Sequence, residues 1–304
     1  MAEAGRITVI VNGRTNQGGK PEAIDDLRAR FAKIGAPVTI DCVPEGRDLA
    51  SHASQAAARG DIVVAAGGDG TVSTIAAVAV ETGATLGVLP MGTLNHFAKD
   101  VGVPQDLDAA VAAVVAGTHR QVDVAEVNGH IFINNSSVGI YPRLVWEREL
   151  EQRRGHRKSI AFAIAMVRTW RRYRTVVARL EVNDPDTIVR TPFVFVGNNE
   201  YKAEGFELGG RTTLDAGQLS VFLAPECGQY EFLTLPFRAL VRRLRTGARF
   251  AGVSAASVNV SVPYPRVSVA RDGEVDIMQP PLVYRIRPRA LRIIVPAPSS
   301  APAS

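Results

Sequence analysis

The sequence predicts two domains, an N-terminal doubly wound α/β domain and a β-rich, sandwich-like domain with inserted helices. Up to about residue 120, apolar strand-like runs alternate with helical runs roughly every 20 to 25 residues, which is typical of a parallel sheet. Beyond that point, short strand-like runs follow one another with turn residues between them. The chain has 304 residues, of which 46% are hydrophobic, so it is long enough to build two cores. We expect a first domain at 1–122, a second at 123–288, a strand at 289–296 that could return to the first domain, and a disordered tail at 297–304.

The first domain is organised around a strand that turns sharply into a helix. The run 61–66 is apolar after its first residue, and an alanine-rich helical run extends to about residue 82. Between them lies Gly67-Gly68-Asp69-Gly70-Thr71, where glycines let backbone N–H groups and a helix N-terminus meet a phosphate. Asp69 would repel a bare phosphate, so it indicates a nucleotide with Mg²⁺. The alternative is an ordinary glycine-rich turn with a helix-capping aspartate.

Two further loops follow strands of the same predicted sheet. The strand at 6–11 ends at the polar, glycine-rich loop 12–20, and Pro21 then opens a helix to about residue 34. A strand at 38–43 and a helix at 47–59 come next, and the strand at 85–89 ends at the segment 90–100. Because ligands of doubly wound sheets bind at the carboxyl ends of the strands, we expect all three loops to share one crevice. A helix at 106–116 completes this domain, and a flexible turn is the alternative reading of the loop 12–20.

The second domain reads as a series of short strands. Asn128-Gly129 predicts a hairpin between strands at 121–127 and 131–138. Further strands are expected at 176–182, 188–197, 218–223, 257–262, 266–270, 282–287 and 291–295.

Two basic helical stretches interrupt these strands. The stretch 142–174 carries ten Lys and Arg against three Glu and has an apolar stripe made by Ile160, Ile164, Val167 and Trp170. The stretch 230–245 combines apolar residues with four arginines. Residues 1–122 hold 10 basic and 13 acidic side chains, whereas residues 123–304 hold 25 and 17, so the second domain is the one expected to meet an anionic membrane. The alternatives are helices that pack on a sheet with a solvated basic face, and an arginine-rich composition without a specific partner.

Several classes of protein are disfavoured by the sequence. Two cysteines are too few for a disulfide framework, and the N-terminus lacks the shape of a signal peptide. No apolar run approaches the roughly 20 residues of a membrane span, so we expect a cytoplasmic protein. The five histidines lack the spacing of a metal cluster, and the basic segments lack the interleaved aromatic residues of a nucleic-acid module.

Four segments together resemble one known family. They are Gly67 to Thr71, Pro90 to Ala98, Leu214-Asp215-Ala216-Gly217 and Asp272-Gly273-Glu274. They are similar to the diacylglycerol kinase catalytic domain, whose superfamily includes bacterial soluble diacylglycerol kinases and sphingosine kinases. The resemblance covers nearly the whole chain, and it implies an α/β nucleotide domain, a β-rich lipid domain and an active site between them.

The resemblance also implies roles for individual residues. Asp69 would bind the nucleotide or Mg²⁺, and Asp215 would belong to a second, structural metal site. Glu274, supported by Asp272, would be the base that takes the proton from a lipid hydroxyl, whose oxygen attacks the γ-phosphate of ATP. The residues implied in ATP binding are Asn12, Gly13, Arg14, Thr15, Asn16, Gly67, Gly68, Asp69, Gly70, Thr71, Val72, Ser73, Thr74, Gly92, Thr93 and Asn95.

The sequence departs from the usual family pattern at several positions. Gly13 stands where a proline is common, Ser73-Thr74 where Asn-Glu is common, and His96 where an aspartate is common. Cys42 replaces a threonine, and Ala216 replaces one carboxylate of the structural metal site.

Taken together, these features predict a lipid kinase that depends on ATP and Mg²⁺ and meets its substrate at the membrane surface, with diacylglycerol as the first candidate acceptor. The alternatives are a regulator of the same fold that has lost catalysis, and an NAD kinase. The sequence leaves open whether the protein forms a homodimer.

Overall fold

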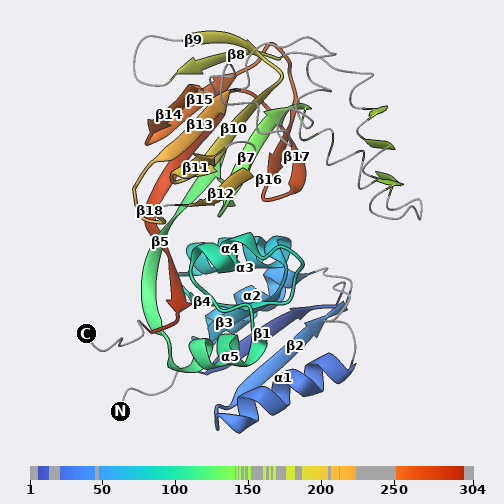
Figure 1. Cartoon of the computed structure of the whole chain (residues 1–304), viewed down its shortest axis with the longest axis vertical. Helices are drawn as coiled ribbons and strands as arrows, with labels where there is room; N and C mark the ends of the chain where they lie inside the picture. Colours follow the sequence, from blue (N-terminus) through green and yellow to red (C-terminus); the bar gives the residue numbers. More distant parts are fainter. Residues whose placement is uncertain are drawn as a thin grey trace. The chain divides into compact units, whose positions relative to one another are not determined.

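The computed structural model divides the chain into two compact units, drawn in Figure 1. The first unit comprises Met1–Val124 with Pro288–Ser304, and the second comprises Ala125–Arg287. The structure describes residues 6–13, 21–44, 48–140, 176–181, 187–204, 207–211, 213–223 and 251–297, with single positions between 142 and 168. The expected helix at 230–245, the loop residues Arg14, Thr15 and Asn16, and most of the expected tail lie outside these residues.

The first unit is the predicted doubly wound α/β domain. Its strands run parallel in the order β2-β1-β3-β4. Helices α1 and α5 contact each other, as do α2 and α3, and the strands lie between these two pairs (Figure 1). The strands are β1 (Ile7–Asn12), β2 (Val38–Val43), β3 (Ile62–Gly67) and β4 (Thr85–Pro90). The helices are α1 (Pro21–Lys33), α2 (Leu49–Ala58), α3 (Asp69–Thr82), α4 (His96–Asp100) and α5 (Leu107–Ala116).

Strands β1, β3 and β4 of the first unit are buried on both faces, which is why their sequences are largely apolar, whereas the edge strand β2 is only partly buried. One carboxylate, Asp61, lies buried just before β3. It accepts hydrogen bonds from Arg6 Nε at 2.6 Å, from Thr8 Oγ1 at 2.8 Å and from Arg59 Nε at 3.0 Å. Burial alone would raise the pKa of Asp61, but these three donors outweigh it and hold the pKa below its usual value.

The second unit is the predicted β-rich domain. Six antiparallel strands lie in the order β14-β13-β10-β7-β16-β17, and β18, β15, β8 and β9 are neighbours in a second sheet with β5 and β6. The strands are β5 (Thr118–Val127), β6 (His130–Phe132), β7 (Asn135–Gly139), β8 (Val176–Glu181), β9 (Thr187–Thr191), β10 (Phe193–Asn198), β11 (Tyr201–Glu204), β12 (Glu207–Arg211), β13 (Leu219–Leu223), β14 (Ala251–Ala255), β15 (Ser257–Ser261), β16 (Val267–Arg271), β17 (Glu274–Met278) and β18 (Leu282–Val295).

The core of the second unit lies between its two large sheets. Val138, Val196 and Val269 come from the six-stranded sheet, and Phe132 and Tyr284 come from the other one. The rings of Phe132 and Tyr284 meet edge to face, with centroids 6.2 Å apart. Complete burial raises the pKa of the Tyr284 hydroxyl.

Four of the expected strands are interrupted, divided or joined in the structure. The run expected at 131–138 is interrupted after Phe132, because the next amides bond to a carboxylate instead of a neighbouring strand. The run expected at 188–197 is divided at Pro192, which has no N–H to donate to a sheet. The two strands expected at 282–287 and 291–295 are one strand, β18.

Strand β18 runs from the second unit into the first. Its beginning pairs antiparallel with β15, and Arg292 and Ile293 near its end pair in parallel with β4. At the division between the units, Arg289 adopts a left-handed conformation with φ 52°, and its N–H donates to Asp123 Oδ1 at 2.8 Å.

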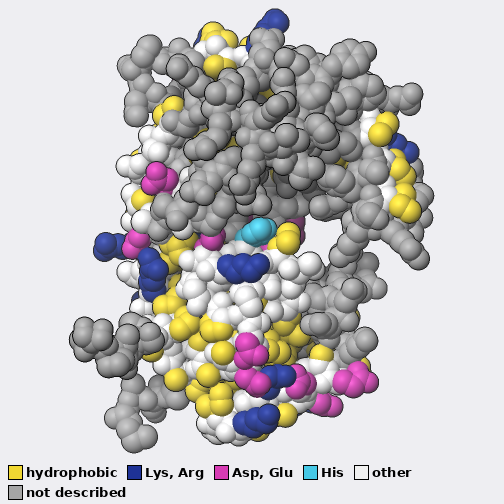
Figure 2. Space-filling view, in the orientation of Figure 1, with side chains coloured by type: hydrophobic (Ala, Val, Ile, Leu, Met, Phe, Trp, Pro, Cys, Tyr) yellow, Lys and Arg dark blue, Asp and Glu magenta, His cyan; other side chains and the backbone are white. Residues whose placement is uncertain are grey.

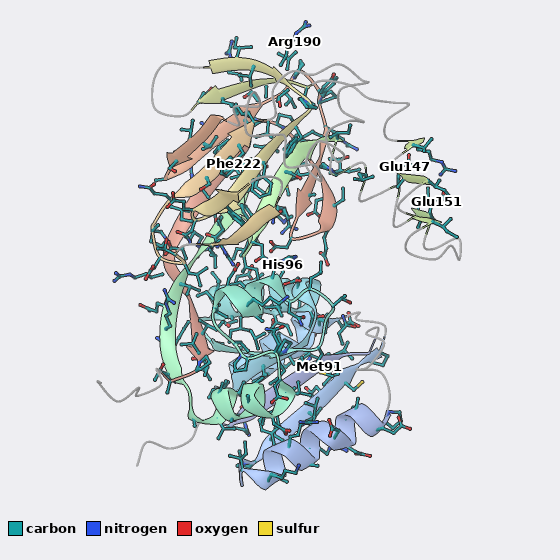
Figure 3. All side chains as sticks on the ribbon, in the orientation of Figure 1. Met91, His96, Glu147, Glu151, Arg190 and Phe222 are labelled. Atoms are coloured by element: carbon teal, nitrogen blue, oxygen red, sulfur yellow. The ribbon has the colours of Figure 1, made fainter. Side chains whose placement is uncertain are left out.

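The described positions between Pro142 and Arg168 are helical. Glu147 and Glu151 are buried side by side (Figure 3), and both accept hydrogen bonds from Arg168 Nη1, at 3.4 Å and 2.6 Å. Figure 2 shows hydrophobic side chains in a row along this segment. None of the helices in the described part of the chain is long and apolar enough to span a bilayer.

Candidate active site

The end of β1 and the loops after β3 and β4 meet within the first unit, as expected for one edge of a parallel sheet. Asn12 ends β1, and its Nδ2 donates to Thr71 Oγ1 in α3 at 2.9 Å. Met91, which follows β4, donates its N–H to the carbonyl of Gly67 at 3.1 Å. Hydrogen bonds therefore join residues that lie far apart in the sequence at this edge.

Glycine is required where these loops touch. A Cβ built on Gly67 would lie 2.6 Å from Thr71 Oγ1, and one built on Gly92 would lie 2.4 Å from the Cα of Gly68. Gly68 is also the N-cap of α3, and as a glycine it has no side chain with which to cap this helix end. A 14-residue helix that begins in this way presents N–H groups and the positive end of its dipole, which together attract phosphate.

Asp69 connects two of the three loops. Its Oδ1 accepts a hydrogen bond at 3.2 Å from the N–H of Phe97, in the first turn of α4. The family-pattern aspartate is replaced by His96 at the start of that helix, where the side chain is exposed (Figure 3). Asp69 therefore fixes α4 as well as offering a carboxylate at the start of α3.

Asn95 shapes the loop after β4. It is in the left-handed conformation, with φ 51°, and is largely buried. Its side chain accepts from the N–H of Gly92 at 3.0 Å and donates to the carbonyl of the same residue at 3.1 Å. These bonds leave Thr93 exposed at the tip of the loop. Of the two residues, Thr93 is the one whose side chain is open to a ligand.

Mg²⁺ fits the surroundings of Asp69. In nucleotide sites this ion is held by one or two carboxylates, by phosphate oxygens and by water, so a cluster of protein ligands is not required. Asp69 supplies one carboxylate, half-buried beside the glycine-capped end of α3. Within the described residues there is no group of three or more His, Cys, Asp or Glu side chains that could enclose a metal by themselves.

The surroundings of Asp215 do not fit a structural metal ion. Asp215 is exposed, and the neighbouring carboxylate of the family pattern is replaced by Ala216. The N–H of Ala216 donates to Asn199 Oδ1 at 3.0 Å, so an amide side chain holds this loop. Asn199 is itself fully buried and bonded to Gln218 and Ser220.

Glu274 begins β17 after a two-residue turn made by Asp272 and Gly273, whose φ angles are 47° and 90°. Two positive φ angles make this a tight hairpin of the kind that Asp-Gly favours, with Arg271 and Glu274 as cross-strand partners. The Asp272 carboxylate accepts three backbone N–H groups, from Ile133 at 2.8 Å, Asn134 at 2.8 Å and Asn135 at 3.1 Å. Asp272 therefore supports the turn that presents Glu274, while the Glu274 side chain is exposed.

Sequence reasoning missed the residues that hold these loops. Asn199 and Arg211 lie in polar stretches without a motif, and Asn198, Asn199 and Arg211 are all buried. The one signal available was the dipeptide Asn198-Asn199 directly after an apolar run, which is typical of a residue with positive φ.

Comparisons with known proteins agree with this arrangement. A family model described as the diacylglycerol kinase catalytic domain matches residues 6–127. A second, described as the YegS C-terminal NAD kinase beta sandwich-like domain, matches residues 144–295.

Individual relatives point to the same group of proteins. A Pectobacterium atrosepticum protein named "Probable lipid kinase YegS-like" is 30% identical over 235 residues, which are 72% of this chain and 74% of that protein. The diacylglycerol kinase of Bacillus subtilis is 30% identical over 146 residues, 47% of this chain and about half (48%) of that enzyme. The crystal structure of a diacylglycerol kinase from Bacillus anthracis has the same fold, with a TM-score of 0.70, 19% identity and coverage of 97% of this chain and 98% of that one.

The fold, the three loops at one sheet edge and these matches over both units lead to one assignment: the chain belongs to the family of diacylglycerol kinases and YegS-like lipid kinases.

Proposed function

We propose that this protein is an ATP- and Mg²⁺-dependent lipid kinase, and that diacylglycerol is its acceptor. The observation that supports a nucleotide site is the meeting of the end of β1 with the loops after β3 and β4 around the glycine-capped start of α3, with Asp69 beside it. The choice of acceptor rests on relatives that are named diacylglycerol kinases.

In the proposed reaction, the Glu274 carboxylate accepts the proton of the lipid hydroxyl. The hydroxyl oxygen forms a bond to the γ-phosphorus of ATP as the bond from that phosphorus to the β,γ-bridging oxygen breaks, and ADP leaves. The backbone N–H groups at the start of α3 neutralise phosphate charge and hold the chain of phosphates in line. When bound, Mg²⁺ supplies further charge neutralisation on the phosphate oxygens.

The experiment is transfer of radiolabelled γ-phosphate from ATP with Mg²⁺ to lipids in mixed micelles, comparing diacylglycerol with a sphingoid base and a monoacylglycerol. The expected result is labelled phosphatidate. Asp69→Asn keeps an oxygen that can accept from Phe97 and removes only the charge, so we expect loss of transfer with α4 still in place. Glu274→Gln should bind ATP normally and lose transfer. ATP binding without label on any lipid would refute the proposed activity in favour of a regulator.

We further propose that the helical segment between residues 142 and 168 docks on an anionic membrane. Ile160 and Val167 of the expected apolar stripe are 48% and 52% exposed, whereas Ala161 and Ala165 beside them are fully buried. Ile160 and Val167 therefore face away from the protein's own core, while Ile164 is half-buried and Trp170 lies outside the described residues. Residues 152–174 also carry eight Lys and Arg and no acid, which complements anionic head groups.

Sedimentation with lipid vesicles tests this docking surface. Wild-type protein should bind vesicles that contain phosphatidylglycerol and bind phosphatidylcholine vesicles weakly. The double variant Ile160→Asp, Val167→Asp should lose this binding. Ile188→Asp is the matched control, because Ile188 is 62% exposed on β9 and outside the segment. Equal losses for the double variant and the control would refute this surface.

A further inference from the structure

A three-residue segment leads from β6 into β7 and lies between two sets of polar groups. We call it the connector and define it as Ile133, Asn134 and the first residue of β7, Asn135. All three of its N–H groups donate to the carboxylate of Asp272, and the carbonyl of Asn135 accepts from the Asp272 N–H at 2.9 Å. The connector is thus bound along one side to the turn that presents Glu274.

The opposite side of the connector is held by side chains from β10 to β12. The carbonyl of Ile133 accepts from Asn198 Nδ2 at 2.9 Å and from Arg211 Nη1 at 2.6 Å. The carbonyl of Asn134 accepts from the Asn198 N–H at 2.9 Å and from the Tyr201 hydroxyl at 2.8 Å. The connector lacks strand partners at these points, and these groups take their place.

Arg211 is the charged member of this set, and it is 91% buried, with an exposed fraction of 9%. Its Nη2 also donates to Asn134 Oδ1 at 3.2 Å, so its planar fork spans two consecutive residues of the connector. The guanidinium lies over the ring of Tyr201, with its central carbon 5.9 Å from the ring centroid. Arg211 and Tyr201 are register partners in the β11–β12 hairpin, which fixes both donors together.

We propose that Arg211 is a positioning residue for Glu274. Its guanidinium fixes the connector, the connector's amides fix the Asp272 carboxylate, and the Asp272-Gly273 turn fixes the start of β17. The inference rests on the proposed function, since it assigns Arg211 to the same reaction. It adds a residue that none of the motifs contains and that acts through backbone contacts, without touching a substrate.

Hydrogen exchange tests the physical connection independently of activity. The substitution Arg211→Lys keeps the charge, but a single ammonium group cannot reproduce the planar fork. We expect faster amide exchange at Ile133, Asn134 and Asn135 and in the Asp272 turn. Arg190→Lys is the control, because Arg190 is an exposed arginine of the same unit (Figure 3). Unchanged exchange in Arg211→Lys would overturn the inference, whether or not a lipid substrate has been found. Tyr201→Phe removes only the hydroxyl bond to Asn134 and should give a smaller effect in the same direction.

Kinetics then separate positioning from general loss of structure. A displacement of about 1 Å at a reacting group lowers turnover roughly 100-fold, so we expect Arg211→Lys to reduce kcat by roughly 10- to 100-fold with KM for ATP nearly unchanged. In a Glu274→Gln background the same substitution should have little further effect on kcat, because the two residues act as one unit. If the two substitutions reduced kcat independently, so that their separate fold-losses multiplied in the double variant, the inference would be overturned. A Glu274→Gln enzyme with full kcat would remove the base assignment and the inference together, and a wild-type protein without lipid phosphorylation would refute the proposed function itself.

Discussion

The contact between Gly92 and Gly68 allows a quantitative test of the nucleotide site. In Gly92→Ala the added carbon would lie 2.4 Å from the Cα of Gly68, whereas ordinary van der Waals contact begins at 3.4 Å. The two backbones must therefore separate by about 1 Å, and the added carbon also lies 2.7 Å from Asn95 Oδ1. Gly68→Ala is the matched control, because its added carbon would meet the Cα of Gly92 at 3.3 Å and needs a shift of only about 0.1 Å.

We expect the two substitutions to change the free energy of unfolding by very different amounts, although both glycines belong to the same contact. Gly92→Ala should lower the free energy of unfolding by about 1–3 kcal/mol, as overpacking usually does. Gly68→Ala should change it by less than about 0.5 kcal/mol, since φ of −89° suits alanine. Urea denaturation without nucleotide, followed by far-UV circular dichroism, measures both, because helices α1 to α5 contribute to the signal.

Nucleotide affinity gives the second readout of the same substitution. A shift of about 1 Å between the loops after β3 and β4 moves the start of α3 relative to Gly92, and we expect the Kd for ATP to rise roughly tenfold or more in Gly92→Ala. Isothermal titration calorimetry with ATP and Mg²⁺ measures this. Equal destabilisation by the two substitutions, or an unchanged Kd in Gly92→Ala, would refute the reasoning from the close contact.

Three further predictions concern other parts of the chain. Hydrogen bonds hold the pKa of Asp61 in the folded protein below the ordinary value of 3.8, so the stabilisation by this carboxylate is present above that pH and is lost as pH falls through the folded pKa. Asp61→Asn should therefore lower the free energy of unfolding by about 1.5–3 kcal/mol near neutral pH and by progressively less on acidification. Asp25→Asn, at an exposed aspartate, should not lower it measurably. A difference that stays constant down to acid pH would contradict this. Asn12→Ala removes the hydrogen bond from the Asn12 side-chain amide to Thr71 in α3, and it should raise the Kd for ATP roughly three- to tenfold in calorimetry. An unchanged Kd would contradict this prediction. Chelation of divalent cations should stop phosphate transfer but leave the melting temperature of the nucleotide-free protein unchanged. The substitution Asp215→Ala should likewise leave this melting temperature unchanged, because the Asn199 amide holds the loop. A melting temperature that rises with Mg²⁺ alone would contradict this explanation.

The first unit could be predicted well because its signals are local. The turn from β3 into α3 is contiguous in sequence, and its glycines, apolar strand and alanine-rich helix all indicate the same structure. The contact of Gly68 with Gly92 follows from the order of parallel strands, so even this pair could be anticipated as neighbours at one sheet edge.

The second unit could be predicted only in outline, because its decisive contacts are long-range and polar. The strand limits near Ile133 depend on Asp272, which is 139 residues away in the sequence. Arg211 lies in a hairpin of glycine and charged residues without alternation, so periodicity gave no sign of a buried guanidinium there. Such residues are recognised only when their partners are known, since one side of each hydrogen bond is a backbone carbonyl that every residue possesses.

This difference between the units has a consequence for how the reaction tolerates mutation. In the first unit the backbone itself forms the proposed phosphate site, so substitutions should act there mainly through the space that a side chain would occupy, as at Gly92. In the second unit a side-chain network holds the connector and the Asp272 turn, so substitutions act through lost hydrogen bonds. Changes at Arg211 or Tyr201 should then alter kcat without altering ATP affinity, and changes at Gly92 should alter both. A variant of the Arg211 network that weakened ATP binding as strongly as Gly92→Ala would show that the two sets of residues are not energetically separate.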